Sequence, residues 1–168
     1  MDTVAQLRSQ WFDYTHYLRR ERFLDDQFAQ LKKLQDASSP DFVFEVVSLF
    51  FQNSEKVINI MAEALEQNVV DFNQVITYVH RLKGSSAWIG AMRIKNACID
   101  FRNYCEAKDI EGCLGCLQQA RQECLELKNK LENLFRLERQ IVAAGGLVPT
   151  KGELSLVWIV EGGVDGGK

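Results

Sequence analysis

The sequence predicts an all-α protein, an antiparallel four-helix bundle with two additional N-terminal helices. Residues 1–144 contain one proline and four glycines, so few residues interrupt regular structure there. The same stretch is rich in Leu, Gln, Glu, Lys and Ala, which favour helices. Its apolar residues recur at spacings of three and four, which is the period of an amphipathic helix.

Two helices are expected within residues 1–38. The apolar positions of the first are Val4, Leu7, Trp11, Tyr14 and Leu18, and those of the shorter second are Leu24, Phe28, Leu31 and Leu34. The run Ser38–Asp41 then predicts a break. We expect Ser39 to cap the next helix and Pro40 to occupy its first position.

Residues 40–143 contain four longer amphipathic segments. The first segment ends near Glu66. At the start of the second, Asp71 and Gln74 have the spacing of a capping box, with Asp in place of the usual Ser or Thr. Asp109 is expected to cap the last segment. The connections near 67–70, 87–90 and 106–109 are short, which favours antiparallel neighbours in a bundle. Residues 1–144 are therefore predicted to form one domain.

Residues 145–168 differ in composition and contain seven of the eleven glycines. Residues 154–160 favour a strand but have no partner strand, and an isolated strand is not stable. We therefore expect a flexible, Gly-rich tail.

Composition limits the possible functions. Lys and Arg number 20 and Asp and Glu number 23, and this balance argues against sequence-independent nucleic-acid binding. No apolar run reaches 18 residues, so no membrane span is expected, and the N-terminus lacks the pattern of a signal peptide. The five cysteines, without a secretory signal, indicate reduced thiols in the cytosol or nucleus.

The candidate site lies on the second bundle helix. His80 falls on the flank of that helix's apolar stripe, with Gly84 one turn further along and Lys83 on a neighbouring face. Arg81 adds positive charge, so these residues form a possible site for an anion. A glycine within a helix costs about 1 kcal/mol against alanine, and it allows another molecule to approach closely. Periodicity alone also allows an ordinary half-buried histidine beside a solvated lysine.

The run His80–Ser86 reads HRLKGSS and resembles the HQLKGSS motif of the plant histidine-containing phosphotransfer proteins. The resemblance covers about residues 1–146. It extends to Ile89–Ala91, Lys95–Cys98, Phe101–Arg102, Ile110–Cys113, Leu117–Gln119 and Ala143–Gly146.

This resemblance implies a phosphorelay carrier. His80 would accept a phosphoryl group from the receiver domain of a hybrid sensor histidine kinase and pass it to an aspartate of a response regulator. Lys83 and Arg81 would support the phosphate, and Gly84 would leave room for the partner. The receiver would bring the metal, so the chain itself is expected to need no cofactor or metal and to act as a shuttle more than an enzyme. The resemblance further implies cytokinin-type signalling, in the cytoplasm and nucleus.

Two positions depart from the family pattern. Arg81 stands where glutamine is usual, and Ala87 and Trp88 stand where serines are usual. Trp88 either fills the core or contacts a partner, and we favour the core, because aromatic side chains usually pack inside. Some relatives have asparagine in place of the histidine, so the alternative function is a non-catalytic helical adaptor that binds receivers. The presence of His80 favours the carrier.

Two further predictions concern docking and thiols. The receiver is expected to dock on a surface formed by the first two helices and the exposed side of the fourth, which is the second bundle helix. The candidate residues from the short second helix are Phe23, Leu24, Gln27 and Phe28. The pair Cys113-x-x-Cys116 raises the possibility of redox or zinc chemistry. No second Cys or His pair completes a tetrahedral site, so structural thiols are expected instead.

Overall fold

The computed structural model describes residues 2–162, and the side chains of residues 2–158. These residues form seven α-helices, which confirms the predicted all-α class. They are α1 (Thr3–Arg20), α2 (Asp26–Lys33), α3 (Phe42–Leu65), α4 (Phe72–Ile89), α5 (Met92–Glu106), α6 (Ile110–Ala143) and α7 (Lys151–Gly162).

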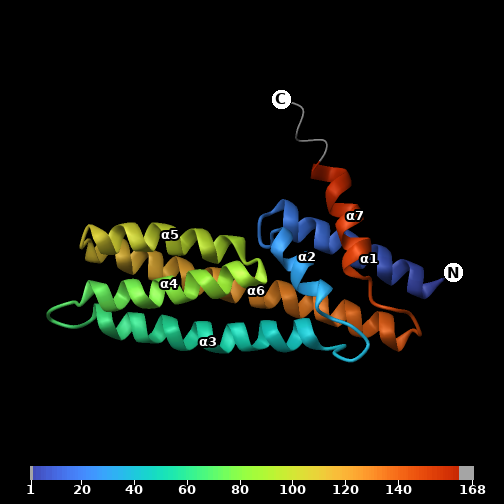
Figure 1. Ribbon diagram of the computed structural model, residues 1–168, viewed down its shortest axis with the longest axis horizontal. Helices are drawn as coiled ribbons and strands as arrows, with labels where there is room; N and C mark the ends of the chain where they lie inside the picture. The colour runs from blue at the N-terminus through green and yellow to red at the C-terminus, as the bar shows by residue number, and fades with distance from the viewer. Residues whose placement is uncertain (1, 163–168) are drawn as a thin grey trace.

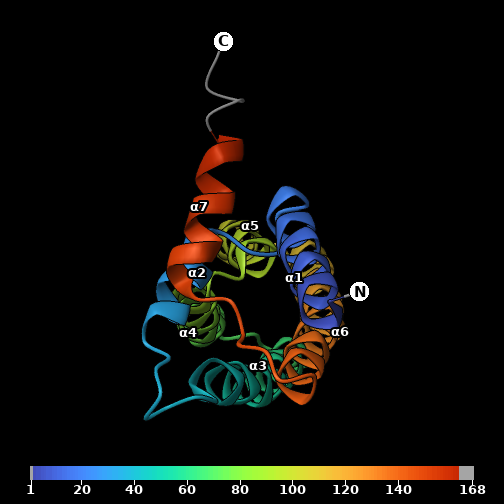
Figure 2. The same ribbon diagram turned by 90° about the vertical axis from the view of Figure 1, so that its right-hand side faces the viewer.

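Helices α3 to α6 form the antiparallel four-helix bundle (Figures 1 and 2). Each packs against its two neighbours in the ring, so α4 contacts α3 and α5, and α6 lies diagonally across from it. Their apolar stripes meet in one core, which includes Phe50, Met61, Val79, Phe101 and Leu127. Although α3 is strongly apolar, no helix in the described part of the chain is long and apolar enough to cross a membrane.

The predicted caps are confirmed at two of three positions. The side chain of Asp71 accepts a hydrogen bond from the Gln74 backbone N–H, and that of Asp109 accepts one from Gly112. The prediction for Ser39 was wrong, because α3 begins two residues later, after Asp41. The Ser39 backbone N–H instead donates to the carboxylate of Asp36, in the turn before α3.

Helices α1 and α2 extend the bundle at one end. Helix α1 packs along the long helix α6, and α2 packs against the end of α4 and against α3 (Figure 1). Lys32 of α2 is buried, with its ammonium 3.3 Å from the Glu138 carboxylate of α6. This ion pair ties the short helix to the longest one.

The C-terminal segment corrects the prediction of a flexible tail. Residues 151–162 form a helix, α7, which packs on α1 and α2 (Figure 2). Leu154 and Trp158 are buried there, and the Arg19 guanidinium lies over the Trp158 ring. Arg8 of α1 forms an ion pair with Glu153. Residues 163–168 of the expected tail lie outside the described residues.

A sequence signal for this helix was present. Thr150 and Glu153 form a reciprocal capping box, in which each side chain accepts a hydrogen bond from the other's backbone N–H. The run from 154 to 160 suggested a strand because its β-branched residues dominate local propensity. Tertiary contacts with α1 and α2 override that propensity.

Candidate functional site

The site is built on the outward face of α4. One side of α4 is buried in the bundle, and the opposite side faces solvent. The buried residues are Val75, Val79, Leu82, Ser86 and Ile89. That face displays His80, Gly84 and Trp88, which are four residues apart and therefore follow one another along the helix.

His80 is exposed in the middle of α4. Neither of its ring nitrogens hydrogen-bonds to another described residue, so the imidazole is available to a partner. Lys83 is half-buried on the flank towards α5, and its ammonium opposes the rise in the pKa of the buried Cys98 thiol that burial causes. The structure thus keeps His80 and Lys83 one turn apart on neighbouring faces, as the sequence predicted.

Arg81 points to a different flank of the helix. Its guanidinium carbon lies 5.1 Å from the centre of the Tyr78 ring, a cation–π contact within α4. Nearby hydroxyl groups are also occupied within the helix, because Ser85 and Ser86 both donate to the carbonyl oxygen of Leu82. Of the two cationic side chains of α4, Arg81 lies over an aromatic ring and Lys83 does not.

Gly84 leaves an open surface beside His80. A Cβ atom at this position would meet no other atom within 4 Å. Internal packing therefore does not require glycine here, although glycine in a helix interior costs about 1 kcal/mol relative to alanine. The open surface is consistent with close approach by another molecule.

Gly90 holds α2 against the end of α4. It ends the helix with a left-handed backbone, φ 82°. A Cβ atom there would lie 2.6 Å from the Phe28 backbone nitrogen. The Gly90 carbonyl accepts a hydrogen bond from the Asp25 N–H, and the Gln27 side-chain amide donates to the Trp88 carbonyl at 3.2 Å. This junction fixes α2 against the C-terminal end of α4.

The predicted docking residues are wrong in three of four cases. Phe23, Leu24 and Phe28 are 5%, 1% and 1% exposed and belong to the core. These side chains pack the short α2 region against the bundle. They are therefore not available to a partner. Gln27 is half-buried, and its amide binds the end of α4.

Trp88 also differs from expectation. It was predicted to fill the core, but 47% of its surface is exposed. At 100° per residue, Trp88 falls about 160° from Ser86 and about 120° from Leu82, so the helical period itself placed it outside the buried stripe. The general tendency of aromatic residues to be buried was the wrong guide here.

The five cysteines lie on α5 and α6, and three of them, Cys98, Cys105 and Cys113, are buried. Cys113 approaches Cys105 rather than Cys116, with the two sulfur atoms 3.6 Å apart. Burial raises the pKa of Cys98, Cys105 and Cys124 to about 12, so these thiols are poor nucleophiles at neutral pH. Among the described side chains, no three His, Cys, Asp or Glu residues gather in a way that could hold a metal ion.

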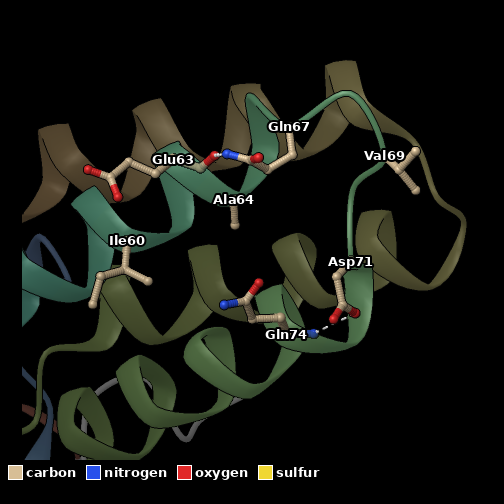
Figure 3. Close-up of a pocket in the computed structure, with 7 residues that line it drawn as sticks. All are labelled: Ile60, Glu63, Ala64, Gln67, Val69, Asp71 and Gln74. Atoms are coloured by element: carbon tan, nitrogen blue, oxygen red, sulfur yellow. Dashed lines mark hydrogen bonds between the residues drawn. The ribbon is translucent and has the colours of Figure 1, made fainter.

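A shallow hollow lies at the far end of the bundle, between the end of α3 and the start of α4 (Figure 3). Its lining includes Ile60, Gln67, Asp71 and Gln74. Asp71 and Gln67 form hydrogen bonds within their own segments there. The hollow contains neither His80 nor Lys83, so it is separate from the candidate site.

Comparison with known proteins decides the family. The Hpt domain, the histidine-containing phosphotransfer domain, matches residues 45–137, which span most of the bundle. The chain belongs to the Hpt domain family. It is 54% identical to histidine-containing phosphotransfer protein 1 of Arabidopsis thaliana, over 89% of this chain and 96% of that protein. This confirms the resemblance to plant phosphotransfer proteins.

Other Hpt relatives show the fold and the range of the family. A solved Hpt structure from Medicago truncatula superimposes with a TM-score of 0.79 at 50% identity, covering 86% of this chain and 97% of that one. The chain is also 46% identical to rice pseudo histidine-containing phosphotransfer protein 1, over 73% of this chain and 66% of that protein. Helix α7 lies beyond the residues that the Hpt domain matches.

Proposed function

We propose that this Hpt protein carries phosphoryl groups on His80, from a receiver domain of a hybrid sensor histidine kinase to a response regulator. Family membership supports the role of a phosphorelay carrier. His80 is assigned as the acceptor because its imidazole is exposed and forms no hydrogen bond with a described residue. Gly84 leaves the surface beside it open.

The chemistry suits a neutral imidazole. Histidine side chains are largely neutral and nucleophilic near pH 7. A ring nitrogen of His80 attacks the phosphorus of an aspartyl phosphate, so a P–N bond forms, a P–O bond breaks, and the aspartate leaves as a carboxylate. Transfer to a response regulator reverses these bonds on a second aspartate. Both steps depend on in-line positioning and on neutralisation of the phosphoryl charge.

Positive charge comes from α4 and from the partner. Helix α4 contains Arg81 and Lys83 and no acidic residue. Lys83 is in the better position to face a phosphoryl group on His80, because Arg81 lies over Tyr78. The receiver supplies the metal ion and the reacting aspartate, so this chain is a mediator that is phosphorylated and released.

The test is transfer from a labelled phospho-receiver domain to this protein. The wild type should gain the label, and His80→Gln should gain none. The variant Lys83→Gln should still be labelled, but more slowly. Label on the His80→Gln protein would show that another residue is the acceptor. Binding of the receiver without any transfer to the wild type would favour a non-catalytic adaptor instead.

We also propose that this relay serves cytokinin signalling and connects the cytoplasm to the nucleus. The support is the similarity to phosphotransfer proteins of Arabidopsis and rice. A fluorescent fusion expressed in plant cells should appear in both compartments. In cells that lack the related proteins, the wild type should restore the cytokinin response and His80→Gln should not.

A further inference from the structure

We propose that Trp88 is an apolar anchor for the receiver domain that docks on His80. This inference rests on the proposed function and names a contact that helps to select the partner. It concerns the outward face of α4, defined here by His80, Gly84 and Trp88.

Trp88 is the exposed tryptophan among the three tryptophans of this chain. The other two tryptophans, Trp11 and Trp158, are 0% and 2% exposed, whereas Trp88 is 47% exposed. Tryptophan is among the residues most enriched at the energetic centres of protein interfaces. Its large apolar ring loses little conformational entropy when a partner covers it.

The position of Trp88 ties it to the phosphotransfer site. Eight residues separate it from His80, which is roughly 12 Å along the helix axis at the usual rise per residue. Gly84 lies between them and presents no side chain. A domain that approaches closely enough to reach His80 therefore passes over Gly84 and meets the indole, so one docked surface covers all three positions.

The backbone under Trp88 is held in place before any partner arrives. Its carbonyl accepts the hydrogen bond from the Gln27 amide of α2. Two residues later, Gly90 joins α4 to the start of α2 through the Asp25 N–H. These contacts hold the helix end from which Trp88 projects, and they leave its indole free for a partner.

Charge favours a receiver as the occupant of this face. The whole chain has a net charge of −3, yet α4 has two cationic side chains and no acidic one. A receiver that holds a metal ion presents acidic side chains around its reacting aspartate, which complement this local charge. The matching receiver surface would place an apolar patch beside that acidic site.

The experiment measures binding of an isolated hybrid-kinase receiver domain, loaded with magnesium and beryllofluoride to mimic the aspartyl phosphate. Trp88→Ala should weaken binding at least ten-fold, and Trp88→Phe should recover most of the loss. The matched control is Leu125→Ala, which removes an exposed apolar side chain from α6, the diagonal helix. The control should bind within two-fold of the wild type.

A small-molecule donor separates docking from chemistry. Phosphoramidate transfers its phosphoryl group to histidine and releases ammonia, without a receiver. Trp88→Ala should be labelled by phosphoramidate at the wild-type rate, but by the phospho-receiver at least ten-fold more slowly. Equal loss with both donors would show that the substitution disturbs His80 itself and would overturn the proposal.

Fluorescence quenching by acrylamide shows directly whether the indole is covered. Trp11 and Trp158 are buried, so the quenching of the free protein reports mainly on Trp88. Adding the receiver should protect that signal. Protection that grows with protein concentration in the absence of receiver would identify a second copy of the chain as the occupant and overturn the proposal.

The failures of the two proposals are distinguishable. Normal receiver binding and transfer by Trp88→Ala would overturn the anchor and leave the carrier function intact. Absence of transfer to the wild-type protein would overturn the carrier function and, with it, the anchor.

Discussion

At Gly84, helix stability favours alanine, whereas close approach of a partner favours glycine. The space beside it is empty, so alanine would fit in the free protein and would remove the cost of a helix-interior glycine. We expect Gly84→Ala to raise the free energy of unfolding by about 0.5–1 kcal/mol, measured by urea denaturation.

The same variant should be a poorer acceptor. The added methyl group projects from the outward face of α4, where the receiver must approach His80. We expect slower transfer from a phospho-receiver and an unchanged rate with phosphoramidate. A variant that is more stable and accepts from the receiver as fast as the wild type would contradict a role for Gly84 in close approach.

For some residues, the sequence alone was enough to predict which side of a helix they occupy. The helical period placed His80, Lys83 and Gly84 correctly, because a long amphipathic helix has a well-defined buried side. Phe23, Leu24 and Phe28 were misplaced because they belong to a region too short for periodicity to separate the packed side from a binding side. Their burial depends on contacts with α4 and the rest of the core, which the sequence does not state.

At the scale of elements, the Lys32–Glu138 ion pair attaches α2 to α6. Both side chains are largely removed from solvent, and burial raises the pKa of Glu138, with Lys32 opposing the rise. We expect Lys32→Met to destabilise the protein by about 3 kcal/mol at pH 7, because it leaves a buried carboxylate without its cation. The double variant Lys32→Met, Glu138→Leu should recover most of this loss.

The pH dependence gives an independent check on that pair. Without Lys32, the pKa of Glu138 in the folded protein rises further above its pKa in the unfolded chain. At a pH between these two pKa values, Glu138 is protonated in the folded protein and ionised in the unfolded chain. Stability of Lys32→Met therefore falls as pH rises through that window. Urea denaturation should show a smaller deficit against wild type at pH 5 than at pH 7. An equal deficit at both values would mean that Glu138 does not control the loss.

Helix α7 is the element that the sequence pattern did not predict. An isolated helix of 12 residues is marginal in water, so protection of its amides requires packing on α1 and α2. We expect hydrogen exchange at residues 154–158 to be at least ten-fold slower than in the unfolded chain, and Trp158→Ala to remove this protection without affecting α4. Rapid exchange in the wild type would restore the prediction of a flexible tail.

At the scale of the whole molecule, the four-helix bundle was the most predictable part. Its helices are long, their apolar stripes are regular, and aspartate caps mark the starts of α4 and α6. The Hpt domain matches this same region, residues 45–137. The additions at the ends were less predictable, because α2 and α7 depend on tertiary contacts more than on their own periodicity.

The whole molecule thus presents the outward face of α4, with His80 between two cationic flanks, on a four-helix bundle. The arrangement fits a carrier that meets two receivers in turn through the same surface. Since each encounter must end for the next to begin, the docking interface is expected to be of the small, transient kind.

The carrier function is tested most directly by a complete relay in one tube. It contains a labelled phospho-receiver from a hybrid kinase, the receiver of a response regulator, and either this protein or its His80→Gln variant. We expect label to reach the response regulator rapidly with the wild type. With the variant, it should arrive no faster than it does without any carrier. Equal transfer by the variant, or label that enters the wild-type protein and never leaves it, would contradict a carrier function through His80.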